Sequence, residues 1–72
     1  MRTYRKSFFE TRDGEVMPPN SRVAFYNDRG EIVEVVEVYS LYPELTAKDR
    51  AWDDFPDLAD KATSAAYIGP VR

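Results

Sequence analysis

Two runs of β-branched and aromatic residues flank a short polar loop near the middle of the chain, and this pattern predicts a β-hairpin. Residues Arg22–Asn27 form its first arm and Glu31–Tyr39 its second. The loop Asp28–Gly30 ends in glycine, which suits a type I turn followed by a residue in the left-handed conformation. A chain of 72 residues supports only one hydrophobic core. The hairpin must therefore belong to that core, and the fold must contain a β-sheet.

The loop also sets the expected register, in which Phe25 lies opposite Val33 on one apolar face. Glutamates recur every three residues along the second arm, and a straight strand cannot keep such a period on one face. We therefore expect a bulge near Val35–Val36 that returns Glu37 to the solvent face.

An earlier segment, Phe8–Met17, repeats this turn chemistry at an offset of 16 residues, with Gly14 in the place of Gly30. It predicts a second hairpin. Pro18–Pro19 cannot donate hydrogen bonds to a neighbouring strand, so the second arm of this hairpin must be short. The expected sheet has three main strands, with the short arm as a fourth.

The second half of the chain predicts helices. Thr46 and Asp49 have the spacing of a capping box, which would open a helix that continues through Asp53. A second helix is expected to follow and to end at Gly69–Pro70. Its apolar residues recur at helical spacing along one stripe: Phe55, Leu58, Ala59, Ala62, Ala65 and Ala66.

These elements predict an α+β fold. We expect a small antiparallel sheet of three to four strands, built from two hairpins, with one face covered by one or two C-terminal helices. The chain is interpreted as a single domain over residues 1–72, with a β-hairpin half at 1–40 and a helical half at 41–72.

The chain has no cysteine and no histidine. It therefore has no thiol nucleophile, no disulfide and no imidazole for acid–base catalysis or metal binding. We predict a protein that is not an enzyme, with no catalytic residues, no metal site and no cofactor. No apolar run approaches the roughly 18 residues of a membrane span, so we expect no membrane partner and a cytoplasmic location.

Charge divides the chain, since residues 1–29 carry a net charge of +2 and residues 30–72 carry −5. Asp49 and Asp53 are one helical turn apart, about 6 Å along the axis, which is on the scale of the spacing between phosphates in a nucleic acid. A tryptophan lies within the same acidic stretch. The predicted partner-binding patch consists of Asp49, Trp52, Asp53, Asp54, Asp57 and Asp60.

The leading hypothesis is a small non-catalytic interaction module that binds a protein partner with a basic surface. In its most specific form, the protein is an inhibitor from a mobile element that mimics nucleic acid and blocks a basic nucleic-acid-handling complex. The competing interpretation is that the aspartates only cap helices and solubilise a helix face. Trp52 is then a core residue, whereas an exposed Trp52 would anchor a partner.

Two alternatives stay open. The N-terminal strand interleaves aromatic and basic residues, which is typical of surfaces that stack single-stranded nucleic acid, and the candidate face is Tyr4, Arg5, Lys6 and Phe8. The isoelectric point of about 4.8 opposes direct phosphate binding. The other alternative is a homodimeric structural accessory protein in which edge strands pair between two copies.

Overall fold

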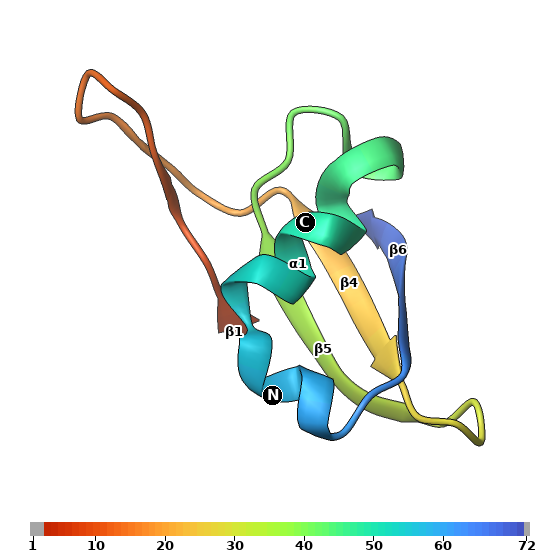
Figure 1. The fold of residues 1–72 in the computed structure, drawn as a ribbon. Helices are drawn as coiled ribbons and strands as arrows, with labels where there is room; N and C mark the ends of the chain where they lie inside the picture. Colours follow the sequence, from red (N-terminus) through yellow and green to blue (C-terminus); the bar gives the residue numbers. More distant parts are fainter. Residues whose placement is uncertain (1–2, 72) are drawn as a thin grey trace.

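The main sheet is mixed, with four strands. The computed structural model describes residues 3–71, and Figure 1 shows the helical segments against one face of the sheet. The strands lie in the order β1 (Arg5–Lys6), β5 (Ile32–Val38), β4 (Ser21–Tyr26) and β6 (Ser64–Pro70). The α+β class is confirmed. The expectation of a wholly antiparallel sheet is wrong, because β1 joins the edge of β5 in the parallel direction.

The first hairpin forms a separate two-stranded ribbon, which extends away from the main sheet (Figure 1). Its strands are β2 (Phe9–Glu10) and β3 (Val16–Met17), paired antiparallel. Both hairpins use the predicted turn. The amide of Asn27 donates to the carbonyl oxygen of Glu31 at 2.9 Å, and the glycine before Glu31 has a φ of 78°. The matching bond from Thr11 to Glu15 measures 2.8 Å, and the glycine before Glu15 has a φ of 84°.

The register of the central hairpin differs from the expected one. Phe25 pairs with Glu34, and Val23 pairs with Val36. The extra residue is Val33, next to the turn, and not a residue near Val35. Because the bulge comes before the long apolar part of β5, it places Val36 on the helix-covered face beside Val23.

The same shift places Glu37 opposite Arg22, on the face of the sheet away from Val36, but Glu37 is buried there instead of exposed. Only 2% of its surface is accessible. It lies beside Arg22, whose Nε donates to its carboxylate at 2.8 Å, and Lys6 Nζ approaches to 3.7 Å. The ring of Tyr4 lies 5.2 Å from the Arg22 guanidinium. The prediction of a solvent-facing Glu37 is therefore wrong, since neighbouring cations compensate its burial.

The helical layer consists of three short consecutive segments. They are a π-helical turn η1 (Pro43–Ala47), the helix α1 (Lys48–Asp54) and a 3₁₀ turn η2 (Pro56–Asp60). The predicted capping box at Thr46 is wrong, because the helical path already begins at Pro43, a residue whose ring favours a first turn. The Thr46 hydroxyl instead lies 2.6 Å from Ser40 Oγ and 3.2 Å from the Tyr42 carbonyl oxygen.

The second predicted helix is wrong beyond its first turn. Helical structure ends at Asp60, and Ser64–Pro70 forms the strand β6, antiparallel to β4. Periodicity identified core residues correctly at Leu58 and Ala62, which are buried. It could not reveal that β4 offers an open edge. Pairing with that edge packs Ala65 and Tyr67 against the core, whereas an isolated alanine-rich helix of this length is marginal on its own.

One apolar cluster joins the two layers. The alanines of η1 and α1 have no accessible surface, and such small side chains let the helices approach the sheet closely. Half-buried side chains of Val33, Trp52, Ala65 and Tyr67 surround the cluster. Its buried members come from β4, β5 and residues 47–62: Val23, Phe25, Val36, Val38, Ala47, Ala51, Phe55, Leu58 and Ala62.

Candidate partner-binding surface

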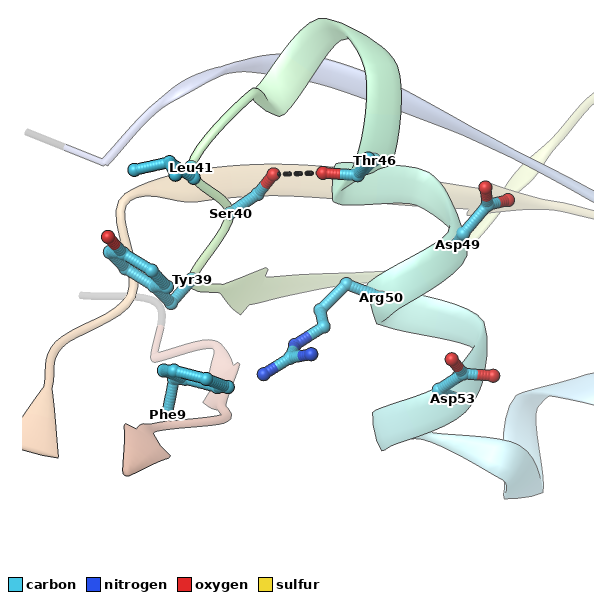
Figure 2. Close-up of a pocket in the computed structure, with 8 residues that line it drawn as sticks. All are labelled: Phe9, Tyr39, Ser40, Leu41, Thr46, Asp49, Arg50 and Asp53. Atoms are coloured by element: carbon cyan, nitrogen blue, oxygen red, sulfur yellow. Dashed lines mark hydrogen bonds between the residues drawn. The ribbon is translucent and has the colours of Figure 1, made fainter. Parts of the chain in front are cut away.

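Two aspartates form an acidic edge on α1. Asp49 and Asp53 are one helical turn apart and exposed. Figure 2 shows both carboxylates projecting from the same side of the helix. Neither carboxylate has an ion-pair partner among residues 3–71. This pair keeps its full charge available at the surface.

Other members of the predicted patch are bound within the molecule. Asp54 accepts a hydrogen bond of 2.6 Å from Ser7 Oγ and lies 3.7 Å from Arg50 Nε. Asp57 pairs with Arg5 at 2.9 Å. Asp60 is exposed at the end of η2. The six residues therefore do not act as one surface, since Asp54 and Asp57 hold the N-terminal segment against the helices.

Trp52 packs on the core. Its ring meets Phe25 edge to face, with centroids 4.7 Å apart and an interplanar angle of 85°. It is half-buried at the border of the apolar cluster. Such pairs contribute roughly 0.5–1.5 kcal/mol beyond area burial. Of the two roles considered for Trp52, the geometry favours the core residue.

An open groove of about 430 Å³ lies beside the acidic edge. Phe9 and Tyr39 stack with centroids 5.8 Å apart, and the Arg50 guanidinium lies 4.5 Å from the Phe9 ring. In Figure 2, Arg50 extends from α1 toward Phe9. The groove is lined by Phe9, Tyr39, Ser40, Leu41, Thr46, Asp49, Arg50 and Asp53. Arg50 already covers the Phe9 ring, so a cationic side chain of a partner would use the carboxylates of Asp49 and Asp53 and place its apolar stem elsewhere along the groove.

Sequence reasoning missed this groove. Its walls come from the β2–β3 ribbon, the end of β5 and α1, which are far apart in the chain. The matched hairpins indicated that Phe9 lies in a strand. The chain carries no local signal that this strand stands beside α1, because the ribbon is separate from the main sheet.

The alternative N-terminal face is largely neutralised. Glu34 and Asp57 accept hydrogen bonds from Arg5, and these bonds raise the pKa of its guanidinium. The same guanidinium lowers the pKa of the Asp57 carboxyl, chiefly through its hydrogen bond. Lys6 is directed to Glu37, and Phe8 is 58% exposed. Tyr4 and Lys6 share a side of the sheet, but Arg5 faces the helices.

Residues 3–71 contain no group of three or more acidic, histidine or cysteine side chains placed to hold a metal ion. No helix in that range is long and apolar enough to cross a membrane. Comparison of the chain with protein-family models, with curated proteins and with solved structures found no match.

Proposed function

We propose that the protein is a non-catalytic interaction module that binds a protein partner with a basic surface through α1. The observation that carries this proposal is the contrast between the two charged surfaces. Asp49 and Asp53 are exposed and have no ion-pair partner in the described part of the chain. Arg5 and Lys6, in contrast, already face carboxylates.

The groove beside the acidic edge supports a protein partner of this kind. An arginine or lysine of the partner can place its charge near Asp49 and Asp53 and its stem along Leu41 and Tyr39. Phosphate would meet the same carboxylates and be repelled. The alternative proposal, single-stranded nucleic-acid binding by Tyr4, Arg5, Lys6 and Phe8, has less support, because Arg5 is held by two acceptors.

In its most specific form, the proposal is an inhibitor from a mobile element that mimics nucleic acid. The support is the carboxylate spacing of one helical turn, about 6 Å along the axis. A basic complex that handles nucleic acid would recognise this spacing through its phosphate-binding arginines and lysines. We also propose a cytoplasmic location. Disulfides are rare in the reducing cytosol, and this chain has no cysteine with which to form one.

The test is capture of a partner from nuclease-treated host lysate by the purified chain and by two matched variants. Asp49→Lys/Asp53→Lys should abolish stoichiometric capture of the protein that the wild type retains. Asp13→Lys/Asp28→Lys makes the same change in net charge at the two hairpin loops and should retain it. Equal capture by both variants would refute a role for α1.

A gel shift with single-stranded oligonucleotides tests the alternative proposal of nucleic-acid binding. It is done at low salt, because binding driven by phosphate contacts is strongest at low salt. The wild type should show no shift. A shift that is lost on substitution of Tyr4 and Lys6 would instead support the nucleic-acid proposal.

A further inference from the structure

The strand β6 forms an open edge of the main sheet. It is the last strand in the sheet order, and no strand within residues 3–71 pairs with its outer side. Ser64–Pro70 contains no charged residue. The opposite edge strand, β1, is two residues long and carries Arg5 and Lys6. Charges, short length, proline and bulges protect an edge from pairing, so β1 is protected, whereas β6 is protected only at its C-terminal end, by the bulge at Ile68 and by Pro70, and Ser64–Tyr67 is open.

An exposed apolar surface adjoins this edge. Leu41, Tyr42 and Leu45 are 69%, 61% and 76% exposed, respectively. Together with Tyr67 of β6 they line an open depression of about 320 Å³. Figure 1 shows the green coil that follows β5 and its loop beside β6. Exposed apolar side chains grouped in this way mark an interaction surface.

We propose that this edge and the adjoining apolar surface form the interface of a homodimer, in which β6 pairs with β6 of a second copy. The two strands run antiparallel about a two-fold axis at Ala66. Side-chain sizes then complement each other, since Ala65 lies opposite Tyr67 of the second copy. The outcome is one continuous sheet of eight strands with both helical layers on one face.

Charge complementarity identifies the occupant as a second copy. Glu44 and Lys48 both line a depression beside Ala65, Ala66 and Tyr67, so each copy presents one acidic and one basic side chain next to the proposed axis. A two-fold axis at Ala66 sets the two depressions side by side in opposite directions, so Glu44 of each copy approaches Lys48 of the other. Neither side chain has an ion-pair partner among the described residues. This proposal is independent of the acidic edge at Asp49 and Asp53.

Sedimentation equilibrium of the purified chain, from micromolar to millimolar concentration, tests the proposal. The wild type should form a dimer. Ala66→Lys places two like charges opposite each other at the axis and should raise the dissociation constant at least about tenfold. Ile32→Lys introduces the same charge at an exposed apolar residue of β5 and should leave the constant unchanged.

Charge exchange gives a second test, which depends less on the fold of the Ala66 variant. Glu44→Lys and Lys48→Glu should each weaken the dimer, and the double variant should restore it. Circular dichroism verifies that each variant is folded. A wild type that is monomeric at every concentration overturns the proposal, and the edge would then be open to an extended segment of another protein. A dimer that neither Ala66→Lys nor the single charge changes weaken also overturns it.

Discussion

Arg5 connects three parts of the molecule through one guanidinium. It donates to Glu34 of β5 and to Asp57 of η2, and it lies 4.9 Å from the ring centroid of Phe55. Arginine suits this place because its planar group can form hydrogen bonds at its edge while its face covers an aromatic ring. The strand β1 is only two residues long, so these contacts supply much of its attachment to the sheet.

The contact between Arg5 and Asp57 predicts a pH dependence. Arg5 lowers the pKa of Asp57 below its ordinary value of 3.8. The ionised carboxylate therefore stabilises the fold above that pH, and the stabilisation is lost as the pH falls through the lowered pKa. The Asp57→Asn variant has no carboxylate to protonate at this position. When the pH is lowered from neutral to about pH 3, its free energy of unfolding should therefore decrease less than that of the wild type.

Urea denaturation over this pH range provides the measurement. The difference at neutral pH should be small, because the pair is exposed to solvent. Asp60→Asn is the matched control, since Asp60 is exposed on the same 3₁₀ turn and has no ion pair in the described residues. Identical pH profiles for wild type and Asp57→Asn would contradict the assignment.

At the scale of elements, the β2–β3 ribbon depends on a few side chains for its position. It shares no strand pairing with the main sheet. Phe9 stacks on Tyr39 at the end of β5 and lies beneath the Arg50 guanidinium of α1. All three side chains also line the groove next to the acidic edge, so we expect the shape of the groove to depend on these contacts.

We therefore predict that Phe9→Ala frees the ribbon without unfolding the sheet. Amide hydrogen exchange should become faster at Thr11, which donates to Glu15 inside the ribbon, and stay unchanged in β4. Phe8→Ala removes the neighbouring ring, which is 58% exposed, and should have no such effect. Equal exchange at Thr11 in both variants would show that Phe9 does not position the ribbon.

The elements that were predictable from sequence are those whose conformation is determined by residues next to them in the sequence. Both hairpin turns follow from glycine and its polar neighbours, and the turn geometry is local. The strand β6 was not predictable in this way. The alanines around Ala65 are compatible with a helix and with an edge strand, and the choice depends on β4, whose paired residues lie about 40 positions earlier.

At the scale of the whole molecule, one small core bears the fold. The buried cluster spans β4, β5 and the helical layer, and it is the one hydrophobic core within residues 3–71. Native proteins have a free energy of unfolding of roughly 5–15 kcal/mol, and small domains lie at the low end of this range. The burial of a single core methyl group is therefore a noticeable fraction of the total stability. Val36 contributes to this cluster from the middle of β5 and has no accessible surface.

Val36→Ala should lower the free energy of unfolding by about 2 kcal/mol, because two buried methyl groups are lost and a cavity remains. Val16→Ala makes the same chemical change at a side chain that is 56% exposed, and its effect should stay within about 0.5 kcal/mol. Thermal and urea denaturation measure both. Equal losses in the two variants would contradict the core assignment.

The candidate site was predictable only in part for a related reason. Helical spacing places Asp49 and Asp53 on one face, and that inference needs only the local sequence. The neutralisation of Asp57 depends on Arg5, which is 52 residues away in sequence. The folded structure decides whether a charged side chain is free to bind a partner. The composition shows only that the charged residue is present in the chain.

The edge-to-face contact between Trp52 and Phe25 has a practical consequence. The chain contains a single tryptophan, and its indole borders the core from α1. Its fluorescence emission therefore comes from one defined environment and should move to longer wavelengths when the helical layer leaves the sheet. The molecule thus carries an intrinsic optical probe of its own packing, and unfolding of every variant above can be followed without a label.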